Sequence, residues 1–287
     1  MRSIKRVGLF VIILIIIVAG YRASLLIKYQ QAYYSESIYV YNLTQDKVEL
    51  AFNENKRRKQ ASLTKLMTAW VGLKYVENLD QMIPINEDVY LESVNNNASM
   101  AGFFGNESVT VRDLLYGTIL PSGAECANTL ATSLFDHYDN FIEIMNQEAN
   151  RMALTNTHYE NADGMDMENH YSSAKDVALL MKECIQDENY LTILMTPTYL
   201  STPTLDHPDG IWMESTIYAK LINNEDYAGN ILGGKSGTTE GAGLCWATLA
   251  EKNNQYYIIV VMGAPVGDIY NPNEFQVADT LKIINEL

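Results

Sequence analysis

The sequence predicts an α+β fold in which both ends of the chain form one antiparallel sheet, with flanking helices and a helical lobe inserted between. Two short alternating segments, 38–42 and 47–52, enclose the turn Thr44-Gln45-Asp46 near the start of the chain. Three β-rich segments separated by turn residues lie near its end, at 231–238, 244–250 and 256–262. The sequence between them has the apolar spacing that is typical of helices. We therefore expect two lobes with a cleft between them.

The chain begins with a segment that is typical of protein export. Three basic residues, Arg2, Lys5 and Arg6, precede an uninterrupted apolar or small run over residues 7–20. This pattern fits a signal peptide or a short membrane anchor, and no A-x-A cleavage site follows it. We expect residues 1–30 to form an uncleaved signal anchor, with a cleaved signal peptide as the alternative. The basic start predicts that the rest of the protein is extracytoplasmic, tethered to the cell membrane or, after cleavage, secreted.

The predicted helices follow the N-terminal hairpin in order. The segment 61–75 has no proline and is apolar on most sides, so we expect a buried helix there. Thr110 and Asp113 have the spacing of a helix cap, and Pro121 ends the helix that they begin. Apolar spacing and capping residues predict four more helices, at 124–135, 141–154, 174–186 and 274–287. Asp139 precedes the second of these, and Ser173 with Asp176 caps the third.

Composition restricts the classes of function. The chain carries 35 acidic and 20 basic residues, a formal net charge of −15 at pH 7, which argues against nucleic acid as a partner. An anionic ligand would have to be recognised locally, by a few placed cations. The 3 cysteines and 4 histidines show no metal-ligand spacing, so a metal site is not expected.

The segment Ser62-Leu63-Thr64-Lys65 places a hydroxyl and an amine on one face of the predicted helix. A serine becomes nucleophilic when a base takes its proton, and a lysine is such a base when burial or a nearby cation keeps it neutral. The unpaired N–H groups of the first helical turn offer a site for an oxyanion. Alone the pattern is weak, because 172–175 also matches it, and we interpret that second match as a solvated helix start.

Two further segments could carry chemistry. Ser122, in Pro121-Ser122-Gly123-Ala124, either caps a helix or relays a proton to a leaving amine. The segment Gly233 to Thr238 places glycines in a predicted strand, which is typical of close approach by a ligand or by another backbone. Lys235 beside the hydroxyl of Ser236 could bind a carboxylate there. The alternative is a simple turn at the edge of the sheet.

Together the three segments resemble the SxxK, SxN and K[ST]G motifs of the active-site serine penicillin-recognising enzymes, in the same order. More closely, the chain resembles the low-molecular-mass serine D-alanyl-D-alanine carboxypeptidases, which are penicillin-binding proteins. The resemblance covers about residues 35–265. It rests on the segments 61–69, 120–123, 161–164 with 170–176, and 234–238.

This resemblance implies a β-lactamase/transpeptidase-like fold, with a single catalytic domain over residues 31–287 and a helical subdomain at about 66–220. It implies a peptidoglycan stem peptide ending in D-Ala-D-Ala as the substrate, β-lactams as inhibitors and no cofactor. The implied catalytic residues are Ser62 as nucleophile, Lys65 as base and Ser122 as proton relay. The implied substrate-binding residues are Lys235, Ser236, Gly237 and Thr238. The backbone N–H groups of Ser62 and Thr238 would form the oxyanion hole.

One position departs from the family pattern. Ala124 occupies the place of the asparagine in the SxN motif, and Asn128 is the nearest amide, one helical turn further on. Two alternatives therefore stay open. A class A-like β-lactamase shares two of the motifs but normally carries SDN and an ExxLN glutamate, which are not found here. A catalytically weakened sensor or scaffold would keep the cleft without useful turnover.

Overall fold

The computed structural model of the chain describes residues 28–29, 32–135, 137–222 and 230–287. The signal anchor predicted for residues 1–30 lies almost entirely outside this part of the chain. Within the described ranges, no helix is both long enough and apolar enough to span a membrane.

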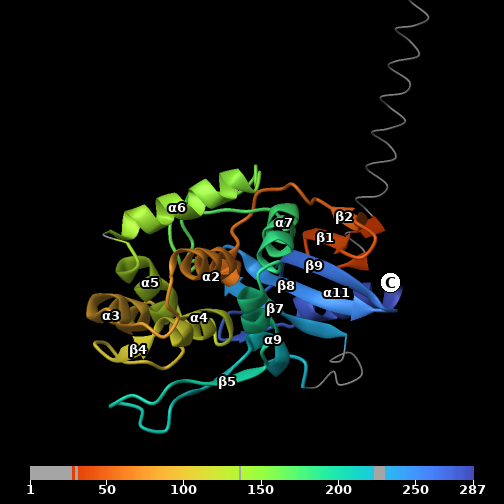
Figure 1. Cartoon of the computed structure of the whole chain (residues 1–287). Coiled ribbons are helices and arrows are strands. Elements are labelled where there is room, and N and C mark those ends of the chain that lie inside the picture. The colour runs from red at the N-terminus through yellow and green to blue at the C-terminus, as the bar shows by residue number, and fades with distance from the viewer. Residues whose placement is uncertain (1–27, 30–31, 136, 223–229) are drawn as a thin grey trace, which may run out of the picture.

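A five-stranded sheet joins the two ends of the chain (Figure 1). β1 (Ser37–Asn42) and β2 (Lys47–Phe52) form the N-terminal hairpin, and β7 (Ile231–Thr239), β8 (Gly243–Lys252) and β9 (Gln255–Ala264) follow one another near the C-terminus. The order is β2-β1-β9-β8-β7, with every neighbouring pair antiparallel. The predicted sheet from both chain ends is confirmed, and β7 is left as an edge strand.

Both faces of the central strand β9 are buried, and its successive side chains, which point to opposite faces, enter two different hydrophobic clusters. On β9, Ile259 and Val261 belong to the hydrophobic cluster that also contains side chains of α11 (Phe275–Glu286). Ile258 lies in the other cluster, together with side chains of α7 (Ala174–Cys184). The sheet is therefore a layer between α11 on one face and α7 with the helical lobe on the other.

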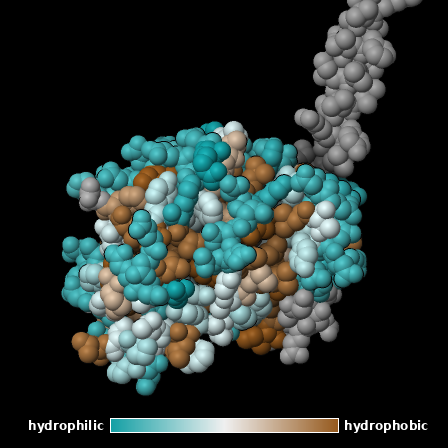
Figure 2. All heavy atoms as spheres, viewed as in Figure 1, coloured by the Kyte–Doolittle hydropathy of each residue, from teal (hydrophilic) through white to brown (hydrophobic). Residues whose placement is uncertain are grey.

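The helical lobe lies to one side of the sheet (Figure 1). Its helices are α2 (Thr64–Tyr75), α3 (Glu87–Asn95), α4 (Val111–Ile119), α5 (Ala124–Ser133) and α6 (Tyr138–Arg151). The predicted cap at Thr110 is confirmed as a capping box, in which Thr110 and Asp113 each bind the backbone N–H of the other. In the same view, hydrophilic residues cover most of the surface, with hydrophobic residues showing between them (Figure 2).

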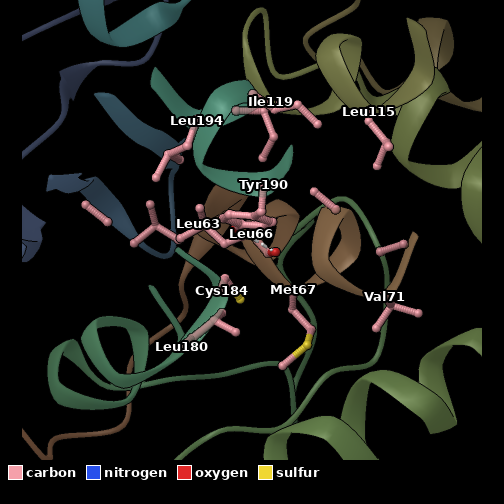
Figure 3. Packing of buried hydrophobic residues seen from close by; sticks show 14 of the residues in the cluster. Leu63, Leu66, Met67, Val71, Leu115, Ile119, Leu180, Cys184, Tyr190 and Leu194 are labelled. Atoms are coloured by element: carbon pink, nitrogen blue, oxygen red, sulfur yellow. Dashed lines mark hydrogen bonds between the residues drawn. The ribbon is translucent and has the colours of Figure 1, made fainter. Parts of the chain in front are cut away.

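Helix α2 lies at the centre of the larger hydrophobic cluster (Figure 3). Its side chains Leu66, Met67 and Val71 are 0% exposed, as predicted for a buried helix. The hydroxyl of Tyr190, on α8 (Glu188–Met195), donates to the carbonyl of Leu66 at 3.0 Å. The neighbours labelled around α2 come from α4, α7 and α8: Leu115, Ile119, Leu180, Cys184, Tyr190 and Leu194.

Some elements differ from the sequence prediction. Helix α6 begins at Tyr138, so Asp139 lies in its first turn rather than before it; the polar first turn conceals the start from apolar spacing. Helices α3, α8 and α9 (Thr216–Ala219) were not predicted. Neither were three short antiparallel strand pairs: β3 (Met82–Pro84) with β4 (Ser108–Thr110), β5 (Thr198–Leu200) with β6 (Trp212–Glu214), and β10 (Gly267–Asp268) with β11 (Asn271–Pro272).

Candidate active site

Ser62 lies in a tight turn directly before α2. Ala61 has a positive φ of 48°, which is uncommon for a residue with a Cβ atom, and Ala61–Leu63 form a single 3₁₀ turn. The helix predicted over 61–75 therefore begins as 3₁₀ and becomes α-helical at Thr64. The hydroxyl of Thr64 donates to the carbonyl of Ala61 at 2.8 Å and fixes the turn. Ser62 is partly exposed, whereas residues 64–69 in the first turns of α2 are buried.

Lys65 directs its amine at the hydroxyl of Ser62. Nζ lies 3.1 Å from Ser62 Oγ and donates to the backbone carbonyl of Asp163 at 2.7 Å. The residue is 2% exposed. This burial lowers the pKa of the Lys65 amine, and the opposing charges of Asp163 and Glu125 do not cancel its effect. A neutral amine can accept a proton, so the pair has the geometry of a nucleophile and its base.

The loop 161–164 also holds Lys65, through the backbone carbonyl of Asp163. Gly164 has a φ of +93°, and a Cβ atom there would lie 2.0 Å from the carbonyl oxygen of Ala61. Glycine is therefore required for the loop to approach the turn that contains Ser62. No role for Asp163 was predictable from the sequence. Its hydrogen bond to Lys65 uses the backbone carbonyl, which every residue has, so the identity of the side chain does not indicate the contact.

Strand β7 approaches the same turn from the sheet. A Cβ atom at Gly237 would lie 2.9 Å from the backbone nitrogen of Ser62, so glycine permits the close approach that its place in a strand predicted. Lys235 is 0% exposed, and its Nζ donates to the carbonyl of Ser236 at 2.9 Å. Burial, followed by the charge of Lys65, lowers the pKa of Lys235 well below its usual value.

Ser122 lies in the turn between α4 and α5. It has a positive φ of 67° and is 4% exposed, and its Oγ has no hydrogen-bond partner among the described residues. It does not cap α5, whose N-cap residue is Gly123. The backbone N–H of Ala124 donates to the carbonyl of Ser99 at 2.7 Å and ties the turn to the segment before α4. A strained backbone and an unpaired buried hydroxyl are more typical of a functional serine than of a cap.

A cleft of about 690 Å³ brings part of the predicted site together. Ser62, Lys65 and Thr238 line it, and so does Ala124. The other predicted site residues are not part of this lining, namely Ser122, Lys235, Ser236 and Gly237. The walls also contain residues that the sequence did not single out, among them Asn96, Asn97, Ser99, Asp166, Ile269 and Tyr270. None of them lies in one of the motif segments, so no sequence signal marks them.

A buried histidine supports the turn that contains Ser62. The backbone N–H of Glu160 donates to Nδ1 of His170 at 3.0 Å, so the ring proton lies on Nε2. Nε2 is 2.7 Å from the hydroxyl of Thr64, which in turn binds the carbonyl of Ala61. Burial lowers the pKa of His170 to about 4, so the ring is neutral at physiological pH.

The second Ser-x-x-Lys match, at 172–175, is not the solvated helix start that its sequence suggested. Ser173 does cap α7, since it accepts from the backbone N–H of Asp176 at 3.2 Å. Ser172 and Ser173 are nevertheless 1% and 0% exposed, because Ser172 pairs with Arg58 in a β-bridge.

In the described part of the chain, no group of three or more His, Cys, Asp or Glu side chains could hold a metal ion.

Known proteins with similar sequences share one description. A family model described as D-alanyl-D-alanine carboxypeptidase matches residues 27–266. The D-alanyl-D-alanine carboxypeptidase DacF of Bacillus subtilis is 32% identical over 217 residues, which are 74% of this chain and 53% of that protein. The D-alanyl-D-alanine carboxypeptidase DacD of Escherichia coli is 29% identical over 229 residues, which are 77% of this chain and 56% of that protein. The chain spans about half the length of these curated relatives.

Solved structures with a similar fold include the DD-transpeptidase of Streptomyces K15. That structure superimposes with a TM-score of 0.77 at 28% sequence identity, and the match covers 88% of this chain and 96% of the other. The similarity therefore extends over nearly the whole of the transpeptidase and includes the sheet and the helical lobe.

Proposed function

Because the chain belongs to the D-alanyl-D-alanine carboxypeptidase family, we propose that it is a serine D-Ala-D-Ala carboxypeptidase. Its substrate is the peptidoglycan stem peptide that ends in D-Ala-D-Ala, and it removes the terminal D-Ala through an acyl-enzyme on Ser62. The observation that carries this proposal is the buried amine of Lys65, 3.1 Å from the hydroxyl of Ser62.

Lys65 acts as the base in acylation. Burial favours its neutral form, so Nζ takes the proton from Ser62 while Oγ attacks the carbonyl carbon of the penultimate D-Ala. The second hydrogen bond of Nζ, to the carbonyl of Asp163, holds the amine in line with the hydroxyl.

The backbone N–H groups of Ser62 and Thr238 stabilise the negative charge that develops on the substrate carbonyl oxygen. Ser62 lies in the turn before α2, and Gly237 brings the edge strand β7 against that turn. One such donor typically contributes about 3–4 kcal/mol to the stability of the transition state. Both donors belong to the backbone, so their positions depend on how closely the strand and the turn pack.

The remaining site residues act on the two ends of the departing D-Ala. Lys235, with Ser236 and Thr238 on the same strand, binds the terminal carboxylate, whose negative charge favours the protonated form of the buried amine. Ser122, whose hydroxyl is buried and unpaired, passes a proton to the leaving amine. Water then hydrolyses the acyl-enzyme. β-Lactams acylate Ser62 in the same way and inhibit the protein.

The location of the protein is part of the proposal. Residues 31–287 form one catalytic domain with a helical subdomain at about 66–220, and residues 1–30 tether it to the outer side of the cell membrane. The basic start and the apolar run over residues 7–20 support this location. Digestion of intact cells by an added protease tests it, because only an extracytoplasmic domain is cleaved.

Release of D-alanine from an N-acylated peptide ending in D-Ala-D-Ala tests the function. We expect wild type to release D-alanine and Ser62→Ala to release none while keeping its fold. Folded wild type that releases none would support the sensor or scaffold instead, and equal release by Ser62→Ala would remove the serine from the reaction. Rapid repeated turnover of penicillin would favour the β-lactamase. Adding an amine acceptor to the assay distinguishes hydrolysis of the acyl-enzyme from transfer of the acyl group to the amine. Such a transfer is what the name DD-transpeptidase of the Streptomyces protein describes.

A further inference from the structure

Asn128 lies one helical turn beyond Ala124 on α5, beside the loop that holds Lys65. Its Nδ2 donates to Oδ2 of Asp163 at 3.0 Å, and its Oδ1 accepts from the hydroxyl of Tyr138 at 3.2 Å. Ala124 itself offers only a methyl group to the cleft. The amide that is missing from the second motif is thus found on the next turn of the same helix, in contact with a neighbour of the base.

The hydrogen-bond network determines which way this amide faces. The backbone N–H of Ala162 donates to the hydroxyl of Tyr138 at 2.9 Å, so the hydroxyl proton is directed at Oδ1 of Asn128. The NH₂ group then faces the carboxylate of Asp163. Helices α5 and α6 therefore fix this side chain together, and neither alanine nor aspartate at position 128 could make both hydrogen bonds.

The network decides which part of Asp163 meets Lys65. Nζ of Lys65 binds the backbone carbonyl of Asp163 at 2.7 Å. The carboxylate of the same residue accepts instead from Asn128 and, at 3.1 Å, from the backbone N–H of Met165. A carbonyl holds the amine in place, whereas a carboxylate at the same distance would strongly favour its charged form.

We propose that Asn128 is a positioning residue for Lys65, and that it keeps the carboxylate of Asp163 turned away from the amine that must act as a base. This inference rests on the proposed role of Lys65 in the acylation of Ser62. Without the amide of Asn128, the carboxylate can rotate toward Nζ and form an ion pair. The pair holds the proton on Lys65 and disables the base at neutral pH.

Other charged or titratable groups also face Lys65. Asp163 is the strongest of the neighbours that favour the protonated amine, and Glu125 and Cys126 on α5 follow it. On β7, the amine of Lys235 is the neighbouring cation, and the charge of Lys65 helps to lower its pKa. Burial outweighs the acidic neighbours and lowers the pKa of Lys65. A substitution that frees only the Asp163 carboxylate leaves the other groups in place, so a change in the titration of acylation reports on that carboxylate.

The rate of acylation by a fluorescent penicillin, measured across a pH series, tests the proposal. Acylation needs neutral Lys65, so the rate rises with pH through the pKa of this amine. For Asn128→Leu we expect the midpoint of the rise to move up by about one pH unit or more. The rate below the midpoint then falls about tenfold or more, while the plateau at high pH is retained. Asn128→Ala is measured in parallel and serves if the leucine variant does not fold.

Two variants isolate the cause. Asp163→Asn in the Asn128→Leu background removes the carboxylate charge but keeps the backbone carbonyl, so the midpoint is expected to return to that of wild type or below. Asn146→Leu is the matched control. Asn146 is a partly buried asparagine, and its amide binds the backbone of Tyr159, in the same segment between α6 and α7 that contains Asp163. Its loss is expected to lower stability without moving the midpoint.

Three results would overturn the inference. A rate that falls equally at every pH in Asn128→Leu, with an unmoved midpoint, would leave Asn128 a purely structural role. A shift that persists after Asp163→Asn is added would rule out the carboxylate as its cause. Wild type that is not acylated at Ser62 at any pH would overturn the proposed function, and this inference with it.

Discussion

The substitution Gly237→Ala, which adds a single methyl group, tests how closely the edge strand β7 must pack against the turn that contains Ser62. In Gly237→Ala the new Cβ atom would lie 2.9 Å from the backbone nitrogen of Ser62. It would also lie 3.1 Å from Ala61 Cβ and from the backbone nitrogen of Leu63. Gly237 is not in the left-handed region, so the substitution brings no backbone strain of its own. Its effect comes from the collision alone.

The size of the effect follows from these distances. Uncompressed contacts between such atoms lie at about 3.5 Å, so the strand and the turn must separate by about half an ångström. Overpacking of this kind costs about 1–3 kcal/mol of unfolding free energy. Misplacing reacting groups by about 1 Å can cost about 100-fold in rate. We therefore expect acylation to slow about tenfold, because the N–H groups of Ser62 and Thr238 move apart.

Stopped-flow acylation by a fluorescent penicillin, together with urea unfolding, checks this expectation. Gly72→Ala is the matched control. Its Cβ atom would lie 3.2 Å from a methyl group of Leu115, the end of a flexible side chain, and alanine is favoured over glycine inside a helix by about 0.5–1 kcal/mol. The control should be acylated like wild type. If the acylation rate and the unfolding free energy are unchanged in Gly237→Ala, the close packing of β7 against the turn that contains Ser62 is refuted.

Two further predictions concern stability. Glu148, whose side chain is 5% exposed, accepts hydrogen bonds from Trp70 at 3.0 Å and from Lys74 at 2.6 Å, so Glu148→Ala should lower the unfolding free energy by about 1–3 kcal/mol; urea titration showing no loss would contradict this. Burial lowers the pKa of His170 from 6.5 to about 4. The unfolded chain therefore binds a proton that the folded protein does not, and up to about 3 kcal/mol of stability is lost as pH falls through this window. His170→Gln should lose less than wild type over the same pH range, and equal losses in the two proteins would be inconsistent with a buried neutral histidine.

The features that the sequence predicts correctly have local causes. The capping box of Thr110 and Asp113 lies within one turn of helix and fixes the start of α4. The strands near the C-terminus are bounded by turn residues, so their limits are nearly as predicted. Ser62 and Lys65 are close in the chain, so their contact needed only the correct assignment of a helix and its first turn. These elements make up the sheet and the nucleophile segment.

The features that escape prediction depend on contacts between distant segments. Asp163 reaches Lys65 through a backbone carbonyl, and only because Gly164 permits the loop to approach the turn. Helix α3 has Ser93 as its one buried residue, so its sequence carries almost no apolar periodicity. Ser172 is buried by a β-bridge to a residue far away in the chain. Such contacts depend on tertiary structure, which cannot be predicted from the spacing of apolar residues or from composition.

Mass spectrometry of the intact protein after treatment with penicillin tests the central claim most directly. If Lys65 is the base that activates the hydroxyl of Ser62, each chain gains one long-lived penicilloyl group on the peptide that contains Ser62. The Lys65→Ala variant gains none. A protein that gains no mass, or that carries the group on another peptide, would contradict the assignment of the nucleophile.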